Sequence, residues 1–410
     1  MNLRFPLLLI LVCGCLSSRC TRSTEIKGQE TSHVSLYAGS MACKNCHEEV
    51  YKNHQLTPHH LTSQLPDSAS IKGSFEESKN VFFYSPALFV VMDKEHKQFF
   101  QTLYSRNVKI KSKSIDLVVG SGVRGQAYLA WQDSTLYQLP IGYFTTVNTW
   151  ANSPGFSNRP IFNRPITSRC LECHSTSFKK TLLEKYPEHF SKKKFLLGIE
   201  CEKCHGSGIK HVDFHKKNGQ VKEGKFIVSF KNFSRKQELD FCRSCHGGKL
   251  LAKKPAFTFK PGDDLNQYFN ADSLPAPSTQ LDSHGNQYGM LSQSKCFLQS
   301  NMTCLTCHSV HENERGKVVE FSNRCMSCHR EGTKSLPVRQ AGFCSFKKLT
   351  VSQLKQNCIQ CHMPEKNSNS IRMLLQGEDI PTPAKMHVHQ ITVYQDEVIK
   401  YINSIPLSKN

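Results

Sequence analysis

The sequence predicts a mainly α-helical fold with little regular secondary structure and one small antiparallel β insert. Three observations predict it. One cysteine-containing motif occurs seven times along the 410 residues. Hydrophobic residues make up 38% of the chain, below the roughly 45–50% of ordinary globular proteins, so something other than side chains must fill much of the core. Runs rich in β-forming residues lie between the first and second copies of the motif.

The repeated motif is Cys-x-x-Cys-His, and it contains fourteen of the 19 cysteines. The first copy stands alone near residue 45, whereas the other six lie between residues 170 and 362. The cysteines are Cys43, Cys46, Cys170, Cys173, Cys201, Cys204, Cys242, Cys245, Cys304, Cys307, Cys325, Cys328, Cys358 and Cys361. The histidines that close the motifs are His47, His174, His205, His246, His308, His329 and His362.

This order and spacing are what covalent attachment of haem requires. Two cysteines three positions apart can each form a thioether bond with one vinyl group of a porphyrin, and the adjacent histidine then lies beneath the iron as its proximal ligand. We therefore expect seven covalently bound haem c groups and a multihaem cytochrome c fold organised around them. Because each porphyrin is a large apolar body, it also explains the low hydrophobic content.

Other uses of paired cysteines fit the motif less well. Zinc sites and thioredoxin-like redox pairs use this spacing, but they do not need a histidine after the second cysteine of every pair, and neither do disulfides. The formal charge of +20 falls to roughly +6 to +13 once seven haems with ionised propionates are counted. Lysines can therefore pair with propionates, a run such as Lys192–Lys194 is interpreted as a solvated face, and no nucleic-acid binding is expected.

The N-terminus is typical of an exported protein. A short basic start precedes the apolar run Phe5–Val12, which is too short to span a bilayer as a mature helix. The string Val12-Cys13-Gly14-Cys15 is similar to the lipobox of bacterial lipoproteins. It predicts a lipoprotein-type signal peptide over residues 1–14, lipidation of Cys15 and a polar tether over residues 15–40. An ordinary signal peptide cleaved somewhat later is the alternative, and either one exports the chain.

The density of motifs divides the rest of the chain into four segments. These are a first haem-binding segment over 41–75, a β-rich insert with an extended linker over 76–168, a six-haem cytochrome domain over 169–390 and a C-terminal tail over 391–410. Within the insert, runs rich in β-forming residues predict strands at Val81–Tyr84, Leu88–Met92, Gln98–Tyr104, Val108–Val119, Gln126–Trp131 and Thr135–Leu139. Helices are expected after many motifs, with one candidate at Leu182–Leu197; 252–294 is expected to be loop, and 391–405 a strand followed by a short helix.

Twelve further histidines are available for the opposite face of the irons. A second histidine gives a closed, low-spin electron-transfer centre, whereas a vacant face lets a substrate bind. Position relative to the motifs predicts about five bis-His centres and leaves two irons undecided. The candidate distal ligands are His59 or His60, His211, His284, His311, and His387 or His389. Cys296 and Cys344 form a disulfide or remain free.

Two segments resemble the superfamily of the nitrifier tetrahaem cytochrome, the pentahaem nitrite reductases and octahaem hydroxylamine oxidoreductase. They are CHEEVYKNHQLTPH after Asn45 and GIECEKCHGSGIKH at Gly198–His211. The resemblance implies that His59 and His211 are distal ligands. Gly120–Pro140 and His284–Tyr288 are similar to segments of uncharacterised exported multihaem cytochromes. The Cys-x-x-Cys-Lys string of the nitrite reductases is absent, so the resemblance implies the cofactors and haem packing but no specific reaction.

These observations predict an exported heptahaem c-type cytochrome that transfers electrons through mostly bis-His haems. It is expected in the periplasm or outer membrane of a Gram-negative-type bacterium, held at the membrane by a lipid anchor, with other redox proteins as partners. The alternative is a multihaem oxidoreductase with one open haem site that acts on a small nitrogen or sulfur compound. The distal-ligand count favours a carrier over an enzyme, and no catalytic residue is assigned. A third hypothesis gives the β insert a role in docking a partner.

Overall fold

Helices and strands contribute almost equally to the fold. The computed structural model describes residues 37–182, 185–271, 281–329 and 351–404, of which 29% are helical and 28% are in strands. The prediction of a mainly helical fold is therefore wrong. The predicted signal peptide, Cys15, Cys344 and most of the tether lie outside the described residues.

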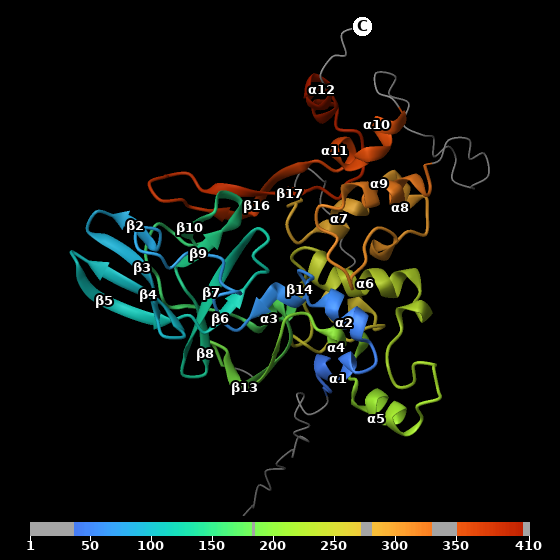
Figure 1. Cartoon of the computed structure of the whole chain (residues 1–410), viewed down its shortest axis with the longest axis horizontal. Coiled ribbons are helices and arrows are strands. Elements are labelled where there is room, and N and C mark those ends of the chain that lie inside the picture. Colours follow the sequence, from blue (N-terminus) through green and yellow to red (C-terminus); the bar gives the residue numbers. More distant parts are fainter. Residues whose placement is uncertain (1–36, 183–184, 272–280, 330–350, 405–410) are drawn as a thin grey trace, which may run out of the picture. The chain divides into compact units, whose positions relative to one another are not determined.

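Two antiparallel sheets occupy the part of the chain between the first two motifs (Figure 1). One has the strand order β2-β3-β4-β5. The other has the order β1-β6-β7-β8-β11, with β9 also pairing β7 and β10 pairing β9. The strands are β1 (Ser63–Gln64), β2 (Val81–Ser85), β3 (Leu88–Glu95), β4 (Gln98–Ser105), β5 (Val108–Ser114), β6 (Leu117–Val119), β7 (Gly125–Gln132), β8 (Thr135–Gln138), β9 (Ile141–Phe144), β10 (Thr149–Asn152) and β11 (Arg164–Pro165). Five of the six predicted strand runs are thus confirmed, whereas the run over Val108–Val119 divides into β5 and β6, which belong to different sheets. Together the strands form more than a small insert.

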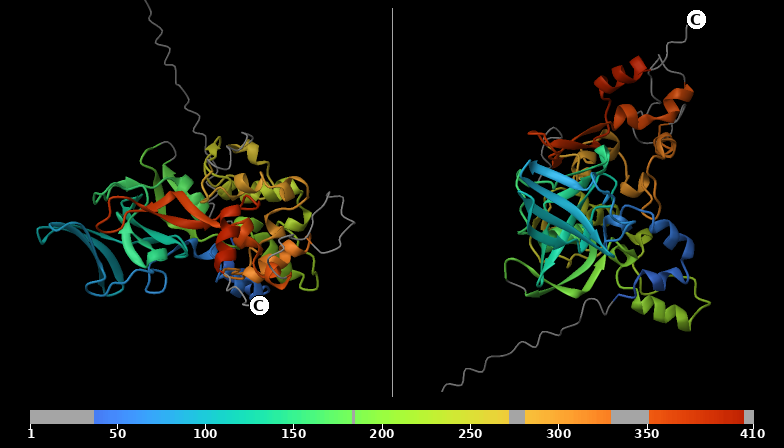
Figure 2. Two further views of the ribbon diagram at one scale, coloured as in Figure 1. Left: turned by 90° about the horizontal axis from the view of Figure 1, so that it is seen from above. Right: turned by 60° about the vertical axis from the view of Figure 1, so that its left-hand side comes forward.

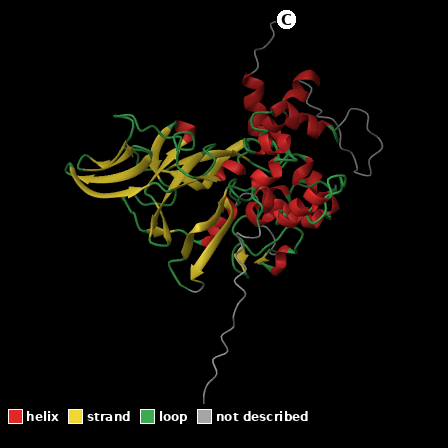
Figure 3. Ribbon diagram, turned by 60° about the horizontal axis from the view of Figure 1, so that its bottom comes forward, coloured by secondary structure: helices red, strands yellow, loops and turns green. Residues whose placement is uncertain are grey.

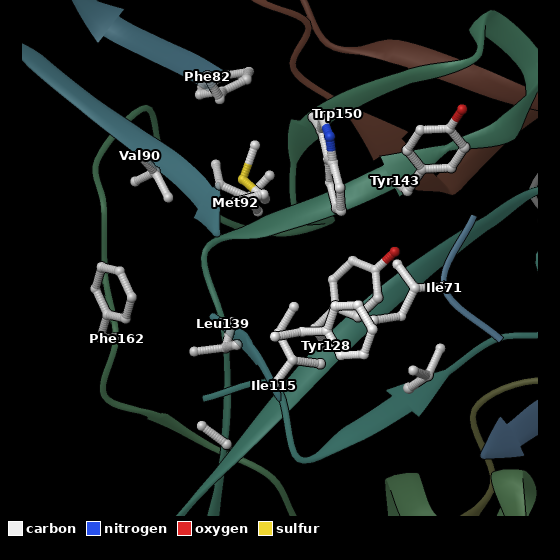
Figure 4. Packing of buried hydrophobic residues seen from close by; sticks show 14 of the residues in the cluster. Ile71, Phe82, Val90, Met92, Ile115, Tyr128, Leu139, Tyr143, Trp150 and Phe162 are labelled. Atoms are coloured by element: carbon white, nitrogen blue, oxygen red, sulfur yellow. The ribbon is translucent and has the colours of Figure 1, made fainter. Parts of the chain in front are cut away.

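A side-chain core holds these two sheets together. Val90 and Met92 on β3, Tyr128 on β7 and Trp150 on β10 are all buried and belong to one cluster (Figure 4). Each strand alternates, so that every second side chain enters the cluster. This region therefore has the conventional apolar core that the low overall hydrophobic content did not predict.

Three further two-stranded antiparallel pairs lie in the region of the later motifs, where helices and loop were expected. They are β12 (Ser175–Leu182) with β13 (His189–Leu197), β14 (Leu251–Ala252) with β15 (Phe269–Asn270), and β16 (Glu365–Met373) with β17 (Thr382–His387). The helix predicted over Leu182–Leu197 is wrong, because Phe190 and Phe195 pack on Phe178 of the neighbouring strand. In the tail, the short helix is confirmed as α12 (Gln395–Ser404), but no strand precedes it among the described tail residues.

The remaining helices are short, and most of them cluster to one side of the two large sheets (Figures 2 and 3). They are α1 (Ser40–Lys44), α2 (Glu48–His54), α3 (Ser168–His174), α4 (Cys201–His205), α5 (Ile209–Lys217), α6 (Arg235–His246), α7 (Gln287–Leu291), α8 (Lys295–Leu298), α9 (Val318–Met326), α10 (Val351–Gln356) and α11 (Cys358–His362). The exception is α3, whose Leu171 packs with Leu117 and Leu129 of the larger sheet. Among the described residues 252–271 and 281–294, most of the segment is loop, as predicted, apart from Ala252 of β14, β15, α7 and one 3-10 turn. Within the described residues, none of the helices has both the length and the hydrophobicity needed to cross a bilayer.

Candidate cofactor-binding site

Each of the seven motifs forms a helical turn. Motifs two, three, four and seven are helical from their first cysteine to their histidine, in α3, α4, α6 and α11. In motifs one, five and six the histidine N–H donates to the carbonyl of the first cysteine, at 2.9–3.0 Å. Residues three apart in a helical turn share one face. The fold therefore places both thiols of a motif on one side, where they can reach one porphyrin.

The motif-bearing helices surround one large cavity of about 2640 Å³. A pocket for a drug-sized ligand has roughly 300–1,000 Å³, so the space suits several large ligands rather than one. All seven motifs contribute lining residues, among them Cys43, Cys173, Cys204, Cys242, Cys307, Cys325 and Cys361. The helical region is therefore built around a space lined by thiols and imidazoles.

Four pairs of imidazoles meet the distance requirement for binding one metal from opposite sides. A metal–imidazole bond is about 2.0–2.1 Å and the ring centre lies roughly 1.1 Å behind the nitrogen, so two opposed rings have centres about 6.3 Å apart. Each pair combines a motif histidine with a histidine outside the motifs. The ring centres are separated by 6.0 Å in His205–His311, 6.1 Å in His246–His59, 6.3 Å in His308–His389 and 6.5 Å in His47–His211.

Hydrogen bonds prepare several of these rings to bind metal through Nε2. His205 donates from Nδ1 to the Val228 carbonyl at 2.9 Å, and His211 donates to the Lys225 carbonyl at 2.8 Å. Because a carbonyl can only accept, Nδ1 must carry the proton and Nε2 keeps its lone pair. Such outer hydrogen bonds commonly orient histidine ligands. The donor set therefore fits the expected haem iron.

Burial keeps other candidate ligands neutral. It lowers the pKa of His59 to about 4, with nearby His246 adding to the effect. Burial also lowers the pKa of His389 to about 4, with His308 as the next cause. A neutral imidazole is the form that binds metal, so these rings are in the required form across the neutral pH range.

His174 of the second motif lies near the candidate ligand His284. The pKa of His174 falls to about 4, through burial first and through His284 second. The Nδ1 of His174 also lies 2.9 Å from the hydroxyl oxygen of Thr62, next to the first strand. The second motif and the predicted ligand His284 are thus brought into one neighbourhood, at the boundary with the larger sheet.

The structure does not pair His387 with a motif histidine among the described residues. Its Nδ1 donates to the Met363 carbonyl at 2.7 Å, and its Nε2 lies 4.0 Å from the Glu365 carboxylate. His60, the alternative to His59, instead has its Nδ1 2.7 Å from a Glu200 carboxylate oxygen. Of the alternatives that the sequence left open, the geometry therefore favours His59 and His389.

A glycine lets the start of the third motif approach the segment that contains His59. Gly198 has a φ of +65°, and a Cβ at that position would lie 2.3 Å from the His60 carbonyl oxygen. The next residue, Ile199, donates its N–H to the His59 carbonyl at 2.9 Å. This close approach joins the start of the third motif to the segment that supplies His59 to the fourth.

Sequence reasoning missed a buried carboxylate inside the third motif. Glu202 is buried, and its two oxygens accept backbone N–H groups of Ala38, Gly39 and Gly208 at 2.7–2.9 Å. It therefore fastens the residues that precede the first motif to the third motif. A charged residue between the cysteines of the motif was the only signal in the sequence, and it does not distinguish a buried anchor from an exposed charge.

Glu202→Ala is expected to lower the free energy of unfolding of the matured protein by about 2–4 kcal/mol, because three partly buried N–H groups lose their acceptor. Urea denaturation followed by haem absorbance measures the change. Glu49, exposed on α2, gives the matched control Glu49→Ala, for which less than about 0.5 kcal/mol is expected. Equal urea midpoints for the two variants would contradict the anchoring role.

One family and one solved structure are similar to this chain. Residues 156–206, which contain the second and third motifs, match the family described as cytochrome c554 and c-prime. No curated protein matches the chain. Among solved structures, the outer cell wall cytochrome OcwA is similar, with 17% identity and a TM-score of 0.47 over 89% of this chain and 81% of that one.

Proposed function

We propose that the protein is an exported c-type cytochrome that carries seven covalent haems and transfers electrons among them. The observation that carries this proposal is the set of four imidazole pairs at 6.0–6.5 Å, each joining a motif histidine to a histidine elsewhere in the chain. The family match over residues 156–206 supports c-type haem at the second and third motifs.

In this proposal each motif holds one haem through its two thioethers and its histidine. His211, His59, His311, His389 and His284 supply the opposite ligands for motifs one, four, three, five and two. A haem between two imidazoles supplies a closed one-electron iron centre. The chain orients the rings through their Nδ1 hydrogen bonds and surrounds the porphyrins with largely apolar walls, and both of these tune the reduction potential.

The segment organisation and location are part of the proposal. Residues 1–14 act as a lipoprotein-type signal peptide, Cys15 is lipidated, and 15–40 tether the haem-bearing part to the membrane. Residues 41–75 and 169–390 bind haem, 76–168 form the β-rich segment and linker, and 391–410 the tail. The protein works in the periplasm or at the outer membrane and exchanges electrons with other redox proteins there.

A second candidate function is reduction or oxidation of a small nitrogen or sulfur compound at one open haem. The observation that favours it is the seventh motif. Among the described residues, no imidazole lies opposite His362, although burial lowers the pKa of that histidine. Binding of nitrite or hydroxylamine to the matured protein, seen as a shift of a high-spin signal, would favour this function over a pure carrier.

His389→Ala is expected to convert one low-spin ferric haem into a high-spin haem, because the fifth motif loses its opposite imidazole. Electron paramagnetic resonance of the purified holoprotein measures the gain of one high-spin iron per molecule. The control is His96→Ala, since His96 is exposed in the turn between β3 and β4. A spectrum of His389→Ala identical to that of the control would contradict the assigned pair.

A further inference from the structure

Three side chains that offer different metal-binding atoms meet at the start of the third motif. One ring nitrogen of His54, a carboxylate oxygen of Glu200 and the sulfur of Cys201 lie within 4.8 Å of one another. His54 ends α2, Glu200 directly precedes α4, and Cys201 is the first residue of that helix. A metal ion with bonds of about 2.0–2.3 Å has its ligand atoms at most about 4.6 Å apart, so small adjustments would let all three bind one ion.

His54 is buried without the partner that a polar ring requires. The residue is 7% exposed, and its Nδ1 has no hydrogen-bond partner within the described parts of the chain. Buried polar atoms are almost always paired, because leaving one unsatisfied costs free energy. The ring of His54 lies edge-on to that of His60, with their centres 5.8 Å apart, and His60 is not a motif histidine. The ring is therefore available for a ligand other than a haem iron.

Glu200 is held in the orientation of a metal ligand. His60 donates from Nδ1 to one of its carboxylate oxygens at 2.7 Å, and the hydroxyl of Ser40 donates to the other. Its backbone N–H donates to the Thr176 hydroxyl at 2.8 Å. Carboxylates that bind metals are commonly fixed by such outer hydrogen bonds, and each oxygen keeps a further lone pair for an ion.

Backbone contacts fix the distance between the two segments that supply these side chains. The N–H of Ile199 donates to the His59 carbonyl at 2.9 Å, and the N–H of Gly198 donates to the Ser63 hydroxyl at 2.9 Å. His54 and Glu200 are far apart in sequence, yet they come from segments in direct contact. The cluster is therefore set by the same close approach that positions His59.

We propose that His54, Glu200 and Cys201 bind one transition-metal ion of the zinc or copper class, in addition to the seven haems. Cys201 is a thioether once haem is attached, and a thioether sulfur is a soft ligand that suits these ions. Imidazole suits both of them as well, whereas magnesium and calcium prefer ligand sets made of oxygen. Three protein ligands leave a fourth position for water. The ion would join the end of α2 to the start of α4.

A haem propionate is the alternative partner for His54. All three side chains line the large cavity, and a propionate oxygen can accept a hydrogen bond from an imidazole N–H. The two explanations differ in metal content. A propionate requires no metal other than iron, whereas the proposed site requires one further ion in each chain.

Metal analysis of the matured holoprotein, purified without a polyhistidine tag, distinguishes them. After equilibration with zinc or copper and removal of free metal, we expect one bound ion for every seven irons. His54→Ala and Glu200→Gln are each expected to weaken binding at least tenfold, since outer partners alone change metal affinity by roughly 10–100-fold. The matched controls are His96→Ala and Glu49→Gln at exposed positions. Seven irons with neither zinc nor copper, or equal binding by site variants and controls, would overturn the proposal.

Intact mass keeps this test separate from that of the proposed function. Seven haems on each variant show that it has matured. A wild-type chain with seven haems and no further metal would overturn the metal site alone, and a chain without haem would overturn the proposed function. Zinc bound to a chain that lacks haem at Cys201 would support the metal site but contradict attachment at the third motif.

Anomalous X-ray diffraction locates the ion in the wild-type holoprotein, so this measurement does not depend on any variant folding. Data from crystals equilibrated with zinc or copper are collected on both sides of the absorption edge of the added metal. We expect a peak about 2.0–2.3 Å from both His54 and Glu200. A map without a peak between these two residues would overturn the proposal.

Discussion

Without covalent haem, the full chain is expected to lose the ordered structure of its motif-bearing region. That region surrounds about 2640 Å³ of cavity. Without porphyrins the apolar side chains that line this space would be exposed to water, so the burial that stabilises the region would be lost; the net stability of a domain is only roughly 5–15 kcal/mol. The helices that line the cavity are also short, and short helices need tertiary packing to persist in water.

The comparison uses the full chain expressed with and without the haem-attachment machinery. Far-ultraviolet circular dichroism of the haem-free chain is expected to lose most of its helical signal. Limited proteolysis is expected to cut between the motifs at least tenfold faster than in the matured protein. The control is the matured His96→Ala variant. Because His96 is exposed, this variant is expected to keep the helical signal and the cleavage rate of the matured wild-type protein. A haem-free chain with full helicity and the same cleavage rate would show that the porphyrins do not organise the fold.

Trp150→Ala is expected to destabilise the β-rich region by about 3–5 kcal/mol, the usual cost of removing a buried aromatic ring. Trp150 is 3% exposed, and its ring centre lies 5.5–5.6 Å from those of Tyr143, Tyr128 and Phe75. Its Nε1 donates to the Ser74 carbonyl at 2.9 Å. The ring also packs on Gly73, where an added Cβ would lie 2.1 Å from Cζ2 of the indole, so the residue at that position has no side chain to fill the space left by the truncation.

Chemical denaturation measures the loss of stability. It is followed by the far-ultraviolet circular dichroism of the β-sheets, because tryptophan fluorescence would itself change in the variant. Trp150→Phe keeps an aromatic ring but loses the bond to Ser74, so a smaller loss of about 1–2 kcal/mol is expected. Val108, 62% exposed on β5, gives the matched control Val108→Ala, for which less than about 0.5 kcal/mol is expected. Equal losses for Trp150→Ala and Val108→Ala would contradict the packing role.

Local patterns were sufficient where the signal itself is local. The β-forming residues of Val81–Tyr84 predicted β2, and the polar residues Gln132-Asp133-Ser134 marked the turn between β7 and β8. The spacing of each motif likewise predicted that its two cysteines reach one porphyrin, and the helical turn that the motif forms places both thiols on one face. In these cases a few neighbouring residues determine the backbone conformation.

Contacts between distant segments determine the features that could not be predicted from the sequence. The segment His189–Leu197 contains leucines and lysines that favour a helix, yet it is a strand because Phe190 and Phe195 find partners on β12. The ligand pairs are similar. Position along the chain marked His389 as a candidate, but only the fold places it opposite the fifth motif rather than the seventh. Pattern and composition contain no information on which distant segments meet.

The central claim is that haem is attached covalently at every Cys-x-x-Cys-His motif and that these haems organise the helical region. Intact-mass spectrometry of the full chain, purified after maturation in an exporting host, tests it most directly. The account predicts an added mass of seven haems, with all fourteen motif cysteines protected from alkylation. A chain with no added porphyrin, or with zinc bound to free thiols in its place, would contradict it.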